Sequence, residues 1–117
     1  MLEININPYA FPGLKLTPKT TADVKDIISA VHKVTKISFI DIASDSRLME
    51  IKDARHLLAY FLREKTSLTW MKIGSIINKD HSSAMHGYKK VKETRHFDKQ
   101  LNKYASKITE LLSTQIN

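Results

Sequence analysis

The residue types best suited to chemistry stand together at Asp80, His81 and Ser82. A carboxylate, an imidazole and a hydroxyl form a nucleophilic triad only when hydrogen bonds join them in a relay. Three consecutive residues at the start of a helix point in different directions, so they cannot form that relay. They can instead present three different polar groups outward, which favours a binding site over a catalytic one.

Other catalytic and metal-binding patterns are missing from the sequence. His81 and His86 are five residues apart and so lie on different sides of a helix, unlike the i, i+4 pair of a helical zinc site. The three glycines are isolated, and no GxxxxGK[ST] or GxGxxG loop is present to cradle a nucleotide phosphate. The absence of cysteine excludes disulfides and thiolate metal sites. We therefore expect no enzyme activity, no metal and no cofactor.

Cations surround these polar residues, and the 117-residue chain carries a formal net charge of +7. Each cation near a phosphate releases counterions and adds affinity for a polyanion of any sequence. The composition leaves open that such charges are merely solvated, but their position favours contact with nucleic acid. Within residues 79–95 the cations are Lys79, Lys89, Lys90, Lys92 and Arg95.

The segment from Ser67 to Val91 predicts two short helices that meet at a polar turn, Asn78-Lys79-Asp80. Asp80 can cap the second helix, because its carboxylate can accept from unpaired N–H groups of the first turn. We interpret the pair as a helix-turn-helix. Apolar residues recur at helical spacing on both sides of the turn: Trp70, Ile73, Ile76 and Ile77 before it, and Ala84, Tyr88 and Val91 after it.

Further helices are predicted around this pair. Thr20 or Thr21 can cap a helix that ends near Lys36, and the short apolar run 37–43 favours a helical turn over an isolated strand. A third helix begins near Met49 and a last one near Asp98. The apolar stripe of the first helix is Val24, Ile27, Ile28 and Val31, and that of the third is Ile51, Ala54, Leu58, Phe61 and Leu62. The stripe of the last helix is Leu101, Tyr104, Ala105, Ile108, Leu111 and Leu112.

Basic side chains occur on the flanks of two of these helices. Arg55 and Arg63 are eight residues apart, about 80° around the helix axis, so we expect both to point toward the same backbone strand of a ligand. Lys99, Lys103 and Lys107 follow the i, i+4, i+8 spacing on the last helix. That row is either a solvated face or an extension of the anion-binding surface.

The organisation predicted is an N-terminal arm, residues 1–19, followed by one small all-α helical bundle, residues 20–117. The arm holds all three prolines, and its apolar residues either pack on the bundle or dock onto a partner. No secretion signal and no apolar run of about 20 residues is present. We therefore expect a soluble, cytoplasmic, nucleoid-associated protein without a membrane partner.

One stretch resembles a known family. Ile73-Gly74, followed by Lys79-Asp80-His81-Ser82-Ser83, is similar to the IG and [RK]DH[ST][ST] signature of the C-terminal DNA-binding domain (domain IV) of the bacterial chromosomal replication initiator DnaA. The resemblance extends upstream through Ala54-Arg55 and Leu62-Arg63-Glu64 and covers roughly residues 20–112. It implies a helical bundle of the DnaA domain IV or Trp-repressor-like type.

The resemblance also implies roles for individual residues. Asp80, His81 and Ser82 would read base edges in the major groove, and Ser83 would contact a base or a phosphate. Met71 aligns with a residue that touches a thymine methyl group. The remaining DNA contacts are cationic. Lys79, Arg55 and Arg63 would hold phosphates, and Arg47 would insert into a narrow A/T-rich minor groove. We also expect a contact from Lys89, which belongs to the basic outer face.

Two departures from the family pattern affect the expected function. The turn before Asp80 is one residue shorter than in most initiators, and no counterpart of their ATPase module occurs in the sequence, so we expect a stand-alone DnaA-like domain. We predict sequence-specific binding to double-stranded DNA, at an A/T-rich DnaA-box-like site, in replication control or transcription. The alternative is a protein-interaction domain that engages another replication protein through its N-terminal arm.

Overall fold

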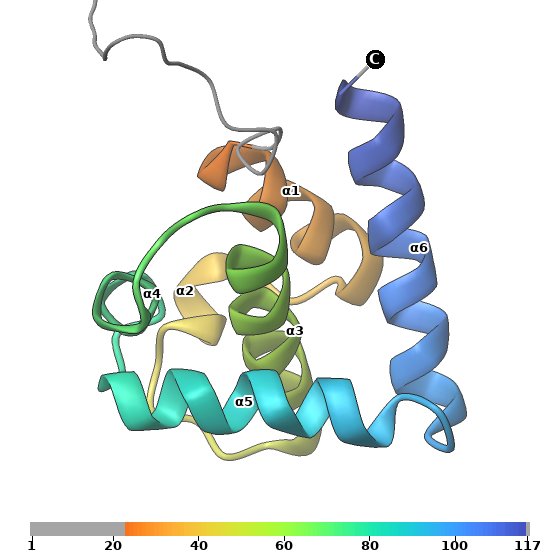
Figure 1. The fold of residues 1–117 in the computed structure, drawn as a ribbon. Coiled ribbons are helices and arrows are strands. Elements are labelled where there is room, and N and C mark those ends of the chain that lie inside the picture. The colour runs from red at the N-terminus through yellow and green to blue at the C-terminus, as the bar shows by residue number, and fades with distance from the viewer. Residues whose placement is uncertain (1–22, 117) are drawn as a thin grey trace, which may run out of the picture.

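The computed structural model describes residues 23–116, and these residues form helices and connecting segments without a strand (Figure 1). The expected all-α bundle is therefore confirmed. The arm, residues 1–19, lies outside the described residues. The helices are α1 (Val24–Thr35), α2 (Phe39–Ile42), α3 (Met49–Lys65), α4 (Trp70–Ile76), α5 (His81–Thr94) and α6 (Lys99–Ile116).

Helix α3 is the centre of the bundle and packs against α1, α2, α4 and α5 (Figure 1). Its residues Leu57, Leu58 and Leu62 are completely buried, and full burial of such a side chain contributes about 1.5–3 kcal/mol. Helix α6 packs on α1 along the predicted stripe, of which Leu101, Ala105, Ile108 and Leu112 are buried. The core thus fixes the helices that carry the polar and basic residues.

The first helix begins later than the sequence analysis expected. Its N-cap is Asp23, whose carboxylate accepts from the Lys25 amide at 3.4 Å, so the assignment of the cap to Thr20 or Thr21 was wrong. Asp is as good a cap as Thr and stands directly before the apolar stripe. The predicted end near Lys36 is confirmed, since Lys36 adopts a left-handed conformation with φ of 67° and closes the helix.

The remaining boundaries follow the predicted signals. The apolar run 37–43 contains α2, which Ser38 caps through a hydrogen bond from the Asp41 amide. Helix α3 begins at Met49 as expected. The Asp98 carboxylate accepts from the Leu101 amide at 3.0 Å and so starts α6. Within residues 23–116, no helix is both long and apolar enough to cross a membrane.

Two residues make the sharp turn between α4 and α5 possible. Asn78 has a φ of 60°, a left-handed conformation that Asn tolerates better than most residues. At Gly74 an added Cβ would lie 2.7 Å from the Lys79 carbonyl oxygen and 2.9 Å from Asp80 backbone atoms. The turn backbone therefore passes directly over Gly74, and only glycine leaves room for it.

Candidate nucleic-acid interface

The first turn of α5 presents polar side chains to solvent. Asp80 caps this helix, and its carboxylate accepts from the Ser83 amide at 2.8 Å. Hydrogen bonds from Ser83 lower the pKa of the Asp80 carboxyl below its ordinary value, so the group is ionised and acts only as an acceptor at neutral pH. His81, Ser82 and Ser83 are exposed beside it. The turn thus offers an acceptor, an imidazole and two hydroxyls to a ligand.

Helix α5 is held by a close approach to α3 on one side. At Gly87 an added Cβ would lie 2.9 Å from Cδ2 of His56, so α5 and α3 are in direct contact at this point. On another side, Tyr88 stacks on Tyr60 of α3 at 5.4 Å and meets Trp70 of α4 at 5.3 Å between ring centroids. These contacts fix the angle at which α5 leaves the bundle.

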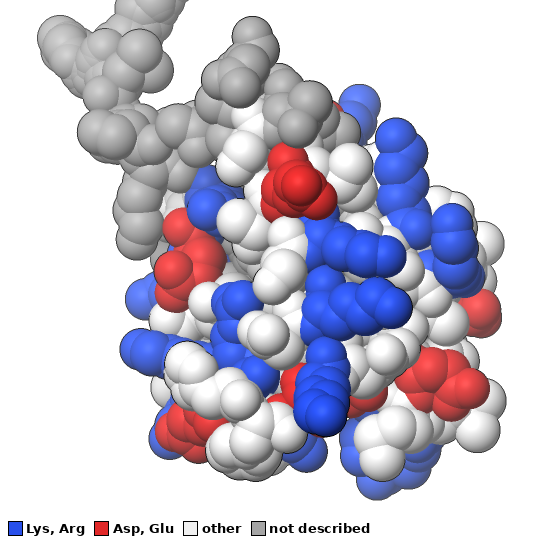
Figure 2. All heavy atoms as spheres, turned by 90° about the vertical axis from the view of Figure 1, so that its right-hand side faces the viewer, with Lys and Arg blue, Asp and Glu red and all other residues white. Residues whose placement is uncertain are grey.

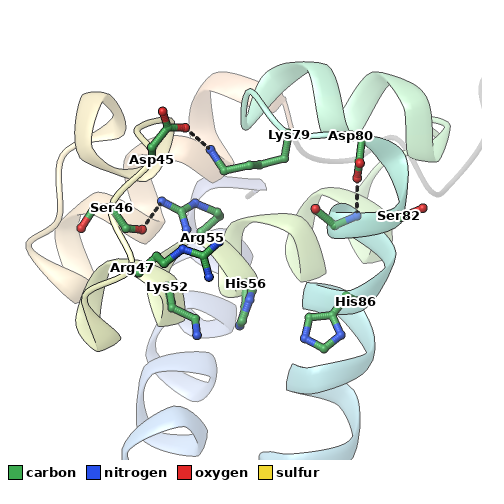
Figure 3. Close-up of a pocket in the computed structure, with 11 residues that line it drawn as sticks. Asp45, Ser46, Arg47, Lys52, Arg55, His56, Lys79, Asp80, Ser82 and His86 are labelled. Atoms are coloured by element: carbon green, nitrogen blue, oxygen red, sulfur yellow. Dashed lines mark hydrogen bonds and ion pairs between the residues drawn. The ribbon is translucent and has the colours of Figure 1, made fainter.

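A cleft of about 630 Å³ lies between the start of α5, the first half of α3 and the connection from α2 to α3 (Figure 3). We call residues 44–48 of that connection the arginine loop. In Figure 3, Arg47 and Lys52 lie on one side of the cleft, and Asp80, Ser82 and His86 lie on the other. The lining residues are Asp45, Ser46, Arg47, Lys52, Arg55, His56, Lys79, Asp80, Ser82, Ser83 and His86.

Arg55 holds the arginine loop in place (Figure 3). Its Nη2 donates to the carbonyls of Ser44 at 2.9 Å and Ser46 at 3.1 Å, and its Nε donates to that of Ile42 at 2.7 Å. Only 8% of Arg55 is exposed. The phosphate contact expected of this residue stays a prediction, and Nη1 is the nitrogen that has no partner within the described residues.

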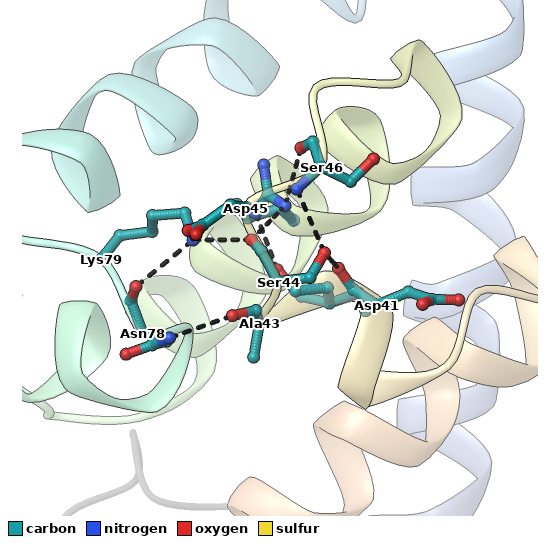
Figure 4. A network of polar contacts seen from close by, with 9 residues as sticks. Asp41, Ala43, Ser44, Asp45, Ser46, Asn78 and Lys79 are labelled. Atoms are coloured by element: carbon teal, nitrogen blue, oxygen red, sulfur yellow. Dashed lines mark hydrogen bonds and ion pairs between the residues drawn. The ribbon is translucent and has the colours of Figure 1, made fainter.

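The turn before α5 is tied to the same loop (Figure 4). The Lys79 ammonium donates to the Ser44 carbonyl at 2.7 Å and lies 3.7 Å from the Asp45 carboxylate. The Asn78 side-chain amide donates to the Ala43 carbonyl at 3.1 Å. The helix-turn-helix and the arginine loop are therefore one connected structure, although they are about 35 residues apart in sequence.

The common orientation expected of Arg55 and Arg63 is not found. The Arg63 guanidinium lies 4.3 Å from the centroid of the Trp70 ring, and its Nη1 donates to the Leu68 carbonyl at 3.1 Å. It supports the connection from α3 to α4, whereas Arg55 supports the connection from α2 to α3. The two side chains point to different segments because tertiary contacts, absent from the helical wheel, determine their rotamers.

Arg47 is the one cation of the arginine loop, and it is free to bind a ligand. Its side chain is exposed and has no hydrogen-bond or ion-pair partner in the described part of the chain. Figure 3 places it at the edge of the cleft, across from α5. The loop backbone around it is fixed by Arg55 and Lys79, so Arg47 is presented on a rigid support.

The cleft includes two histidines that the sequence analysis did not assign to the site. His56 and His86 meet edge to face, with 5.8 Å between ring centroids. His56 Nδ1 is buried and has no partner among the described residues. Burial, aided by the nearby His86, Lys90, Lys52 and Arg55, lowers the pKa of His56 to about 4, so its ring is neutral at pH 7. Lys52, Arg55 and His56 share one α3 face at i, i+3 and i+4, a spacing that could have revealed the group.

The other predicted site residues lie outside the cleft lining. Met71 is 75% exposed on α4, and His81 and Lys89 are exposed on α5. The lysine row of α6 lies on another side of the molecule (Figure 2), where cationic side chains gather along the face of that helix. Lys99, Lys103 and Lys107 are exposed there and have no hydrogen-bond or ion-pair partner among the side chains described, residues 23–113.

The sequence of this chain is similar to one protein family and to several named bacterial proteins. The family described as "Bacterial dnaA protein helix-turn-helix" matches residues 24–91. Among relatives, the chromosomal replication initiator protein DnaA of Borreliella burgdorferi is 35% identical over 97 residues, which cover 82% of this chain and 19% of that protein. The corresponding protein of Gloeobacter violaceus is 31% identical over 94 residues, 78% of this chain and 21% of its own length. The chain thus spans about a fifth of these relatives.

Proposed function

This chain belongs to the bacterial DnaA helix-turn-helix family, and we propose that it binds double-stranded DNA in a sequence-specific manner. The observation that carries the proposal is that the exposed first turn of α5 and the free Arg47 border one basic cleft. The relatives are named replication initiators, so replication control is the process we propose, with transcription control as the second.

We propose that α5 enters the major groove with its first turn foremost. Asp80 accepts from a cytosine or adenine amino group, His81 and Ser82 contact base edges, and Ser83 contacts a base or phosphate. Oδ1 of Asp80 accepts from the Ser83 amide, and the carboxylate keeps further lone pairs that can accept from a base. Met71, exposed on the neighbouring helix α4, packs on a thymine methyl group.

Arg47 enters the adjacent minor groove in this proposal, and one DNA backbone strand crosses the cleft between the two grooves. A narrow A/T-rich minor groove concentrates negative potential and so attracts an inserted arginine. Lys52 and the free Nη1 of Arg55 lie where a crossing phosphate would be held, and Lys89 contacts the backbone farther along α5. Lys79 contributes its charge at the cleft while holding the loop.

Selection of bound duplexes from a random pool, followed by a salt titration, tests this function. We expect an A/T-rich consensus and a steep decrease of affinity with salt. His81→Ala should reduce affinity for the selected duplex about tenfold and leave affinity for a scrambled one unchanged, whereas Lys89→Ala should weaken both equally. A pool that shows no enrichment over many rounds would contradict the proposal.

The alternative, a protein-interaction domain that uses its arm, concerns residues outside the described part of the structure and stays a prediction. Deletion of residues 1–19 tests it, because an interaction that depends on the arm should be lost while DNA binding remains. Unchanged interactions after this deletion would count against the alternative.

A further inference from the structure

Two large apolar side chains follow Arg47 and are exposed to solvent. Leu48 is 62% exposed and Met49, the first residue of α3, is 69% exposed. Neither belongs to the core. Isolated exposed apolar residues are ordinary, but two neighbours beside a free cation at the edge of a binding cleft form a surface that a ligand can cover.

The backbone that carries these side chains is rigid. The Leu48 amide donates to the Ser46 hydroxyl at 3.3 Å, and the Ser46 amide donates to the Ser44 hydroxyl at 3.2 Å. The carbonyls of Ser44 and Ser46 accept from Arg55 at 2.9 and 3.1 Å. Arg47, Leu48 and Met49 are therefore presented together, and a ligand meets them without ordering the loop first.

The chemistry of the surroundings selects the ligand. Arg47 and Lys52 flank the apolar pair, while the nearby Asp45 carboxylate is met by the Lys79 ammonium at 3.7 Å. The Glu50 carboxylate does not share the direction of the Met49 side chain, because it lies about 100° farther around the helix. A second copy of this cationic chain would be repelled here. The minor groove of DNA fits, because its negative potential suits the cations and its deoxyribose walls offer apolar carbon atoms.

We propose that Leu48 and Met49 pack on the deoxyribose walls of the minor groove beside Arg47, and so form an apolar part of the DNA interface. This inference rests on the proposed function and specifies how the minor-groove contact is made. The apolar contact releases no phosphate counterions, so it adds affinity that does not depend on salt. Arg47, by contrast, contributes affinity that weakens as salt increases.

The test uses Leu48→Ser combined with Met49→Ser in the full chain, with Ile40→Ser as control. Ile40 is 81% exposed on α2, outside the cleft lining. On the selected duplex we expect roughly a tenfold loss of affinity with an unchanged salt slope in the double variant, and no loss in the control. Arg47→Ala should instead reduce the salt slope by about 1.

Hydroxyl-radical footprinting locates the contact, because the radicals attack deoxyribose carbons from the minor groove. Wild-type protein should protect a short run of sugars at the minor-groove end of the site, and the double variant should lose that protection alone. Affinity within twofold of wild type together with an unchanged footprint would overturn the inference while leaving the proposed function intact. A double variant that binds DNA as wild type does, but whose mass in solution without DNA differs from that of wild type, would also overturn the inference. That result would assign Leu48 and Met49 to self-association. If wild type selects no duplex, the proposed function fails and the inference with it.

Discussion

The cleft and the α6 lysine row both present cations, but the two regions differ in construction. Two cations at the cleft are fixed by neighbours, Arg55 by three carbonyls and Lys79 by the Ser44 carbonyl and Asp45, and they hold the loop that presents the free Arg47. Lys99, Lys103 and Lys107 of α6 point into solvent without such partners among the described residues. Flexible lysines attract any polyanion, whereas fixed groups can favour one arrangement of DNA atoms. The specificity that we propose therefore depends on the position of the charges more than on their number.

The largest effect should come from removing the support of the cleft. Arg55→Met leaves the carbonyls of Ile42 and Ser46 without their side-chain donor and the Ser44 carbonyl with Lys79 alone, so we expect a loss of about 2–4 kcal/mol in the free energy of unfolding. Urea unfolding monitored by circular dichroism measures it. Lys107→Met on α6 is the matched control and should change this free energy by less than about 0.5 kcal/mol. Equal losses in the two variants would remove the distinction between the regions.

An intermediate effect should follow from pH through His56. Its folded pKa of about 4 lies below the ordinary value of about 6.5, so the neutral ring contributes stability that is present above pH 6.5 and is lost as pH falls toward 4. After allowance for solvent screening, we expect a loss of about 1–2 kcal/mol between pH 7 and pH 4.5. Unfolding at both pH values measures it.

His56→Gln should remove that part of the pH dependence, because glutamine does not titrate. His96→Gln provides the control, since His96 is exposed and does not line the cleft. A pH dependence that is the same in wild type and in His56→Gln would show that His56 is not held neutral by the cleft.

The smallest effect should come from the α6 row. Lys103→Gln and Lys107→Gln together should weaken binding to selected and scrambled duplexes by the same factor, about twofold at physiological salt, because these lysines act only through their long-range charge. Fluorescence anisotropy on the two duplexes measures it. A selective loss on the chosen duplex would bring α6 into the specific interface.

Local sequence signals predicted the helices and several of their ends. Asp80 and Asp98 begin helices as expected. A cap of this kind needs only the backbone amide three residues later in the sequence, so it can be predicted without knowledge of the tertiary structure. The stripe that contains Leu101, Ala105 and Ile108 is buried because its period matches the α-helix. The cap of α1 was misassigned, since Thr20, Thr21 and Asp23 are all suitable residues within four positions.

The site was only partly predictable because long-range contacts assign its cations. Spacing places Arg55 and Arg63 near one face of α3, but it does not reveal that Arg55 meets the arginine loop and Arg63 meets Trp70. The burial of His56 likewise depends on the approach of α5 at Gly87. The sequence identified Met49 only as the start of a helix and gave no role to Leu48. Their exposure beside Arg47 is what makes them candidate ligand contacts.

Whether the cleft reads DNA sequence is tested most directly by the ratio of affinities for the selected and scrambled duplexes, measured in two variants that each lose one positive charge. Arg47→Ala removes the free cation at the cleft, and Lys103→Ala removes one from α6. We predict that the ratio falls about tenfold or more in Arg47→Ala and stays at the wild-type value in Lys103→Ala. Equal weakening on both duplexes in both variants would contradict the claim that the cleft reads DNA sequence.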